Sequence, residues 1–169
     1  YSGLVVLGDP GSGKTTLLKH LTLCLAQPQP GRVTPVRSKR VPVYLALRDV
    51  ADFTLTLDDA LRAAYPMGQL DLSGDFFQRL LDDARHPCLL LLDGLDEVAT
   101  PERRREALDW IECQRKRYPH NLIVVTSRFA GYRGTTRLPE NYLELHVRDF
   151  RDDDVRSFVR RWYQQVETR

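Results

Sequence analysis

Residues 8–16 read GDPGSGKTT and follow directly on an apolar run, LVVL, at residues 4–7. The stretch has the spacing G-x-x-x-x-G-K-[ST], which closes on Lys14 and Thr15. A strand that enters a glycine-rich turn and leaves it as a helix presents backbone amides and a helix N-terminus to phosphate. Because a match at these fixed offsets is rare by chance, the stretch predicts a nucleotide-phosphate site in an α/β fold.

The residues of this loop have different expected roles. Glycines at 8, 11 and 13 permit positive φ angles, so that successive N–H groups point inward around an anion. The ammonium of Lys14 supplies a full charge for the β- and γ-phosphates, and the hydroxyl of Thr15 is an oxygen ligand for Mg²⁺. The helix that begins near Gly13 adds partial positive charge at its N-terminus. We therefore expect nucleotide binding by Gly8, Asp9, Pro10, Gly11, Ser12, Gly13, Lys14, Thr15 and Thr16.

The composition is that of one soluble α/β domain. The 169 residues are 42% hydrophobic and 28% charged, which suffices for one core. A net charge of +2 is too small to indicate nucleic acid as the main partner. No apolar stretch approaches the ~20 residues that cross a bilayer, which argues against a membrane partner. The three cysteines show no C-x-x-C spacing, which disfavours a disulfide framework or zinc site and favours a reducing, cytoplasmic setting.

Strand and helix patterns alternate along the chain, which indicates a parallel sheet with crossover helices. Residues 28–40 are rich in proline and basic residues and predict an exposed loop. Five strands and their helices fit one three-layer α/β/α sandwich over residues 1–169. The expected strands are 4–7, 41–47, 88–92, 122–126 and 142–147, and the expected helices are 13–26, 58–65, 75–85, 101–117 and 152–165.

Acidic residues follow the third expected strand, which is apolar throughout and so predicts a central position in the sheet. Asp93 falls at its carboxyl tip, where open α/β sheets bind ligands, and we expect it to hold Mg²⁺ through a water, opposite Thr15. Hydrolysis also needs a group that orients or deprotonates the attacking water. Asp96 and Glu97 are the candidates for that catalytic role. The alternative is that these two acids cap the next helix.

The fourth expected strand ends in Thr126, Ser127 and Arg128. If this strand lies between the first and the third, a polar side chain at its tip reaches the γ-phosphate. We expect the guanidinium of Arg128 to face the phosphate oxygens, and we place this residue with the catalytic group. The alternative is a surface arginine that follows a strand.

Together these segments resemble a NACHT domain of the STAND class of P-loop NTPases. The resemblance rests on the loop at 8–16, on a second strand reading VPVYLALR at 41–48, and above all on DGLDE at 93–97. Ordinary AAA+ relatives place the catalytic Glu directly after the first Asp, whereas NACHT domains place a small residue there and acids downstream. The strand end at 126–128 and the closing pattern LHVRDF at 145–150, which leads into an amphipathic helix, are similar as well.

The resemblance implies a sheet order of 5-1-4-3-2 and Mg²⁺-dependent binding and slow hydrolysis of ATP to ADP, with GTP as the less favoured nucleotide. In that family the nucleotide state gates self-association, so the implied partner is a homo-oligomer of the full-length protein. It also implies a signalling, antiviral-defence or innate-immune role, and the arginine-rich composition favours a bacterial source. The winged-helix and effector regions of complete members are absent from residues 1–169, so we expect this excised fragment to be weak or inactive alone.

Three other functions stay open. A small-molecule kinase shares the phosphate loop and would use the basic residues at 103–105 and 115–117 as a lid, although their helical spacing favours a solvated or neighbour-contacting face. A nucleotide-dependent interaction module would bind ATP or ADP as a switch with negligible turnover. A nucleic-acid motor would use the basic helix faces, but no interleaving of aromatic and basic residues supports it. No Asn-Lys-x-Asp segment is present, which disfavours a Ras-like GTPase.

Overall fold

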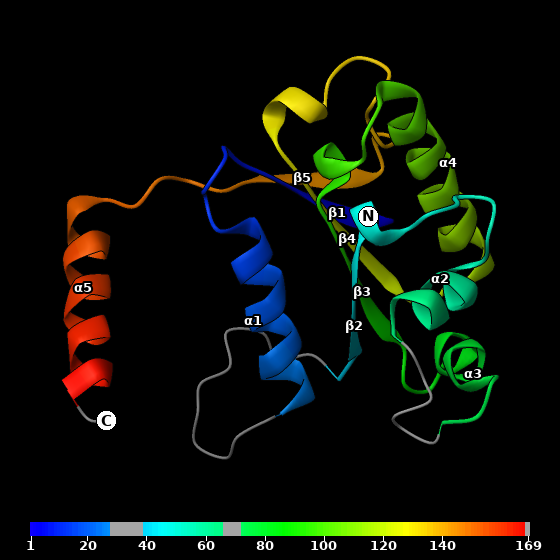
Figure 1. Cartoon of the computed structure of the whole chain (residues 1–169), viewed down its shortest axis with the longest axis horizontal. Coiled ribbons are helices and arrows are strands. Elements are labelled where there is room, and N and C mark those ends of the chain that lie inside the picture. Colours follow the sequence, from blue (N-terminus) through cyan, green and yellow to red (C-terminus); the bar gives the residue numbers. More distant parts are fainter. Residues whose placement is uncertain (28–38, 66–71, 168–169) are drawn as a thin grey trace.

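The computed structural model describes residues 1–27, 39–65 and 72–167, with the backbone alone at 165–167. In this part of the chain the strands form one all-parallel sheet (Figure 1). Its order, β2-β3-β4-β1-β5, is the expected 5-1-4-3-2 read from the other edge, so the prediction is confirmed. The strands are β1 (Gly3–Leu7), β2 (Val41–Ala46), β3 (Cys88–Asp93), β4 (Leu122–Ser127) and β5 (Tyr142–His146).

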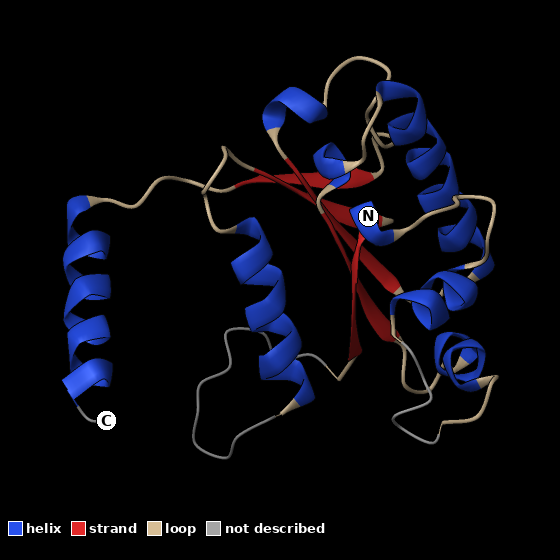
Figure 2. Cartoon of the chain, in the orientation of Figure 1, coloured by secondary structure: helices blue, strands red, loops and turns tan. Residues whose placement is uncertain are grey.

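Helices cover both faces of the sheet and make the three layers that the sequence predicted (Figure 2). Helix α1 (Lys14–Ala26) lies on one face. The other face carries α2 (Leu57–Ala64), α3 (Phe76–Asp82) and α4 (Pro101–Arg117). Short 3-10 turns follow three strands at their carboxyl ends, at most one residue later. They are η1 (Leu47–Asp49) after β2, η3 (Leu95–Glu97) after β3 and η4 (Phe129–Gly131) after β4.

Burial explains the apolar run of β3. The strand lies between β2 and β4 and all of its residues are buried, so neither of its faces meets water. The larger core lies between the sheet and α2–α4 and includes Trp110 and Ile111. A smaller core gathers Leu18 of α1 against Leu91 and Val124. The strand that carries Asp93 is therefore packed against side chains on both faces of the sheet.

The first helix is less buried than its leucine pattern predicted. We expected Leu17, Leu18, Leu21 and Leu25 to form one apolar face. Leu18 is fully buried, but Leu17 is 41% exposed, and the other two are half-buried. Leu17 lies one position from Leu18, about 100° around the helix, and so falls at the edge of the contact with the sheet.

Element ends differ from the expected ones by a few residues. Leu47 was expected in the second strand, but it begins the turn η1. The helix expected over 75–85 ends at Asp82, because the carboxylate of Asp83 accepts the backbone N–H of Arg85 and forms a turn there. Of the loop expected over 28–40, residues 28–38 lie outside the described residues.

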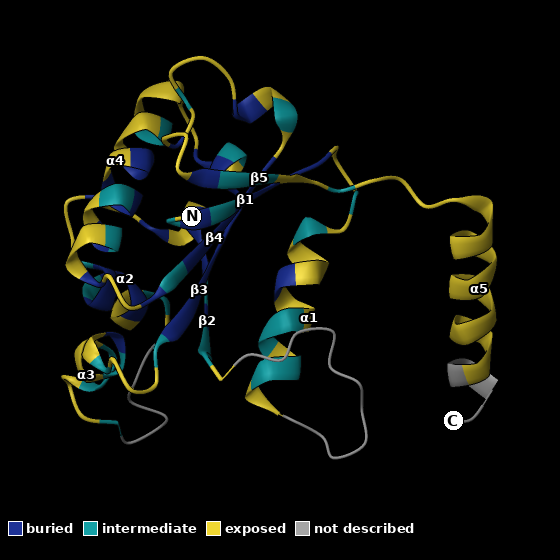
Figure 3. Cartoon of the chain, turned by 180° about the vertical axis from the view of Figure 1, so that it is seen from behind, coloured by how far each residue is buried: buried dark blue, intermediate teal, exposed yellow. Residues whose placement is uncertain are grey.

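Helix α5 (Asp152–Glu167) extends away from the sheet (Figure 1). The sequence predicted a last amphipathic helix here with Val155, Phe158, Val159 and Trp162 at helical spacing. The helix is present, yet every described side chain from residue 151 to 164 is exposed (Figure 3). No apolar surface in the described parts of the chain covers the aromatic side chains of Phe158 and Trp162, which are 55% and 60% exposed.

Candidate functional site

The strand tips that follow β1, β3 and β4 meet at one cleft of about 240 Å³ at the carboxyl edge of the sheet. Because β4 lies between β1 and β3, residues more than a hundred positions apart in sequence become neighbours there. The cleft is lined by Pro10, Gly11, Gly13, Lys14, Thr15, Thr16, Asp93, Gly94, Asp96, Glu97, Thr126 and Arg128.

Ten of the thirteen residues proposed from the sequence line this cleft. The other three, Gly8, Asp9 and Ser12, do not line the cleft and instead supply oxygen atoms to the side chain of Lys14. Its Nζ donates to the carbonyl oxygens of Gly8 at 2.8 Å and Asp9 at 2.9 Å, and to Oγ of Ser12 at 3.3 Å. The ammonium is thus folded back onto its own loop.

The glycines of the loop serve two different purposes. Gly11 and Gly13 have φ angles of 78° and 86°, in the left-handed region that L side chains rarely adopt. The expectation of a positive φ at Gly8 is wrong. A Cβ at Gly8 would lie 2.6 Å from Oγ of Ser12 and 3.1 Å from Cβ of Val147, so this glycine is needed for room.

The start of α1 is open to an anion. Gly13 caps the helix without a side-chain hydrogen bond, and the first turn contains no acidic residue. By helix geometry, the amides of the first turn have no acceptor within the helix. Residues 14–16 of that turn line the cleft, so the amides and the positive end of the helix dipole are available to phosphate oxygens.

Asp93 is a buried carboxylate that is bonded through both oxygens. It is 6% exposed; Oγ1 of Thr126 donates to its Oδ1 at 2.5 Å, and the hydroxyl of Tyr44 donates to its Oδ2 at 2.9 Å. Thr126 also accepts the N–H of Gly94 at 2.8 Å. Burial, and then the bond to Asp93, raise the pKa of Tyr44, so its phenol stays protonated and donates.

The oxygen donors in the cleft fit Mg²⁺. The hydroxyl of Thr15 and the carboxylate of Asp93 line the same space. Each oxygen of Asp93 accepts one described hydrogen bond and keeps further acceptor capacity. A hydroxyl, a carboxylate, waters and phosphate oxygens are the ligands that Mg²⁺ takes in nucleotide sites.

Asp96 binds the segment that carries Arg128. Its Oδ1 accepts the backbone N–H of Arg128 at 2.9 Å, and its Oδ2 lies 2.9 Å from Nε of the same residue. The carboxylate is 10% exposed and packs against Gly131, where an added Cβ would lie 2.5 Å from that of Asp96. The guanidinium expected to face phosphate is therefore paired with an acid, at the wall of the same cleft.

Glu97 is held more loosely. Its side chain is 34% exposed and folds over Gly94, which has a φ of 78°. Oε2 of Glu97 lies 2.7 Å from Nη1 of Arg48, and this hydrogen bond raises the pKa of Arg48. Of the two candidate acids, Glu97 is the one with an oxygen atom left for a water. Neither acid caps α4, because the hydroxyl of Thr100 accepts the N–H of Arg103 there.

Sequence reasoning missed Tyr44 and Arg48 as site residues, although it quoted the strand that contains them. Their place depends on the pairing of β2 with β3, in which Ala46 lies opposite Asp93. Residues two apart share a face of a strand, so Tyr44 lies on the side of Asp93. A lone polar aromatic residue in an apolar strand was the available signal.

The arginines considered as a kinase lid are occupied elsewhere. Arg103 donates to the carbonyl of Ala51, and Arg104 to that of Val98. Arg115 pairs with Glu112 on the same helix. No arginine of 103–105 or 115–117 lines the cleft, so these residues form a basic face of the helix rather than a lid over the cleft.

A family comparison agrees with this geometry. The model of the NACHT domain matches residues 2–165. The chain belongs to the NACHT family. Members of this family are P-loop NTPases, so binding and hydrolysis of nucleotides is the activity that comes with the fold. No curated protein sequence matches the chain.

A solved structure shows the same fold. A chain in the structure of Drosophila ORC bound to DNA superimposes with a TM-score of 0.58 at 20% sequence identity. The match covers 99% of this NACHT chain and 42% of that chain, so the chain spans less than half the length of this neighbour. At such an identity the likeness concerns the fold alone. Among the described residues, no helix is both long and apolar enough to cross a membrane.

Proposed function

We propose that this NACHT chain, residues 1–169, is a single nucleotide-binding domain that binds ATP with Mg²⁺, hydrolyses it slowly and controls self-association through its nucleotide state. The observation that carries the proposal is the convergence of the phosphate loop, Asp93 and the acids at 96–97 on one cleft. Phosphoryl transfer asks little covalent chemistry of a protein, so positioning of charge is most of what such a cleft must supply.

Each wall of the cleft has a proposed role. The amides of the first turn of α1 and the ammonium of Lys14 bind the phosphate oxygens. Thr15 and Asp93 would hold Mg²⁺, which would neutralise phosphate charge when bound. Glu97 orients the attacking water. Arg128 reports the state of the phosphates through its link to Asp96.

Slow turnover follows from the pairing of both acids with arginines. Asp96 contacts Arg128 through its Oδ2, and Glu97 contacts Arg48 through its Oε2, so among the described contacts only Oε1 of Glu97 is open to a water in this arrangement. A neighbouring copy that supplies an arginine is the known route to faster phosphoryl transfer, and it accelerates the reaction about 10³–10⁵-fold. Self-association would then be linked to turnover.

The nucleotide and the biological setting are inferred from the family resemblance. We favour ATP over GTP because the family resemblance implies it, and the lack of an Asn-Lys-x-Asp segment disfavours a Ras-like GTPase. We place the chain in the cytoplasm of a bacterium, as the switch of a multidomain defence or signalling protein that assembles as a homo-oligomer. An effector region elsewhere in that protein would carry the output.

A second function has a specific observation in its favour. An interaction module that binds nucleotide with negligible turnover would also keep Glu97 and Asp96 engaged with Arg48 and Arg128. The two functions differ in whether assembly with ATP raises phosphate release. A non-hydrolysable analogue that changes the oligomeric state while release stays at background would select the module.

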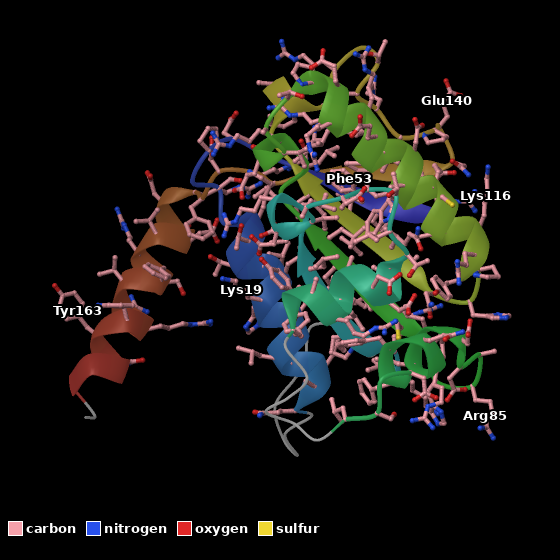
Figure 4. The ribbon with its side chains drawn as sticks, turned by 45° about the vertical axis from the view of Figure 1, so that its right-hand side comes forward. Lys19, Phe53, Arg85, Lys116, Glu140 and Tyr163 are labelled. Atoms are coloured by element: carbon pink, nitrogen blue, oxygen red, sulfur yellow. The ribbon has the colours of Figure 1, made fainter. Side chains whose placement is uncertain are left out.

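The experiment titrates ATP, ADP and GTP into purified protein by calorimetry, with Mg²⁺ and with EDTA. Lys14→Ala is the test variant and Lys116→Ala the matched control, because Lys116 is an exposed lysine on α4, outside the cleft (Figure 4). We expect the wild type and the control to bind ATP equally and Lys14→Ala to bind at least about 100-fold more weakly. Equal binding by all three proteins would refute the site. Phosphate release without an added acceptor excludes the kinase.

A further inference from the structure

We infer that Tyr44 is a positioning residue for the carboxylate of Asp93 and sets how strongly Mg²⁺ binding is coupled to nucleotide binding. The inference rests on the proposed function and adds to it a residue of the neighbouring strand β2. The hydroxyl of Tyr44 donates to Oδ2 of Asp93 at 2.9 Å. A residue that orients a ligand carboxylate acts on the metal through that ligand.

The sheet brings the two residues together. Strands β2 and β3 pair in parallel, with Tyr44 opposite Leu91 and Ala46 opposite Asp93. Side chains on one face of neighbouring strands that lie two positions apart are within reach of a long aromatic residue. Tyr44 therefore reaches the tip of β3 diagonally, from beneath the cleft rather than from its surface.

The hydrogen bond from Tyr44 fixes the plane of the Asp93 carboxylate, which the bond from Thr126 alone leaves free to turn. Thr126 holds Oδ1 of Asp93 and is itself held by the N–H of Gly94. One bond to one oxygen leaves the carboxylate plane free to turn about the last side-chain torsion, which is broad for aspartate. The second bond, to Oδ2, fixes that plane. It therefore decides which lone pairs of Asp93 face Thr15 across the cleft.

Tyr44 is itself held from both sides. Its backbone carbonyl accepts the hydroxyl of Tyr65 at 2.7 Å. Nζ of Lys19 lies 5.9 Å from the centroid of the Tyr44 ring, and Lys19 projects from α1, the helix that follows the phosphate loop (Figure 4). The ring thus lies between α1 and β3. It contacts Asp93 of the cleft directly, and on its other side it faces Lys19 of the helix that follows the phosphate loop.

The test compares two substitutions that each remove one hydroxyl. Tyr44→Phe loses the bond to Asp93, and Tyr65→Phe loses only a bond to a backbone carbonyl. A fluorescent ATP analogue is held at fixed concentration while MgCl₂ is titrated, and its affinity is measured separately in EDTA. We expect Tyr44→Phe to raise the half-saturating Mg²⁺ concentration about 10-fold, with unchanged affinity in EDTA. Tyr65→Phe should match the wild type in both readings.

The possible outcomes distinguish a failure of the role of Tyr44 from a failure of the proposed nucleotide-binding function. Wild-type protein that binds no analogue with or without Mg²⁺ would overturn both. Mg²⁺-dependent binding by the wild type, with the same half-saturation in Tyr44→Phe, would overturn the role of Tyr44 alone, even if that variant melts at a lower temperature. Equal weakening in EDTA and in Mg²⁺ would show a merely structural role. If Tyr44→Phe does not fold, Tyr44→Leu carries the same expectation, since it also lacks the hydroxyl.

Discussion

The two halves of the cleft are built in different ways. The phosphate loop at 8–16 is largely exposed, and its described side-chain bonds run from Lys14 to oxygen atoms of the loop itself. The acidic tip at 93–97 is tied to neighbouring strands, with Asp93 bonded to β2 and β4 and Asp96 bonded to the residue after β4. We infer that the loop adapts to its ligand, whereas the fold presets the tip. Substitutions in the loop should change binding alone, and those at the tip should change stability as well.

The largest expected effect concerns Glu97, the loosest member of the tip. Glu97→Gln keeps the shape of the side chain but removes the charge that orients a water. We expect nucleotide affinity to stay within about twofold and turnover of the assembled protein to fall roughly 1,000-fold. Phosphate release under single-turnover conditions measures this. Turnover that survives would move the role to Asp96 and place it in the rigid part of the tip.

Lys14→Ala tests the loop. We expect about 100-fold weaker ATP binding with a melting temperature within ~2 °C of the wild type, because the lysine is bonded to its loop and not to the core. Differential scanning calorimetry of the ligand-free protein supplies the second reading. A large drop in melting temperature would contradict the distinction between an adaptable loop and a preset tip.

Asp93→Ala tests the tip. The substitution leaves the hydroxyls of half-buried Tyr44 and buried Thr126 without their acceptor. We expect the free energy of unfolding to fall by about 2 kcal/mol. Urea denaturation measures it, with Asp9→Ala as the matched control, because Asp9 is an exposed acid of the phosphate loop outside the cleft lining. Equal stability of the two variants would show that the tip is not preset by its hydrogen bonds.

Arg128→Ala is expected to have a smaller effect. Loss of the guanidinium leaves Asp96 bonded to the backbone N–H of residue 128, so the tip keeps its shape. We expect the ratio of ATP to ADP affinity to change about fivefold, as for a modest coupling between two states. Parallel calorimetric titrations give the ratio. An unchanged ratio would make this arginine a structural partner of Asp96.

The smallest effect comes from an acid outside the cleft. Burial raises the pKa of Asp58, but hydrogen bonds from Thr56 and Arg62 outweigh it, so the net pKa lies below the ordinary 3.8. Its stabilisation is present above that value and is lost as the pH falls through the lower, folded-state pKa. The free energy of unfolding should therefore decline below about pH 3.8. Asp58→Asn should remove that part of the decline, measured by urea denaturation at stepped pH.

Much of the fold was predictable because short local patterns decide it. The loop at 8–16 and the alternation of strand and helix led to the correct sheet order with the help of a family resemblance. The features that the sequence did not reveal depend on contacts between residues distant in sequence. The partners Tyr44 and Arg48 are visible only once β2 is known to pair with β3, and the crowding at Gly8 comes from Ser12 and the distant Val147. Periodicity identified α5 as amphipathic but carried no information on what surrounds it.

The arrangement of Lys14 has a consequence for which anions the cleft admits. Three oxygen atoms of the loop already solvate its ammonium, so the protein is its own competing ligand. An anion binds only if its interaction with the ammonium is more favourable than that of these three loop oxygens. Chloride or a single inorganic phosphate gains little binding free energy over the loop oxygens, while a chain of linked phosphates offers many charged acceptors at once. We therefore expect the self-solvated lysine to disfavour small ions relative to a polyphosphate, without any steric barrier.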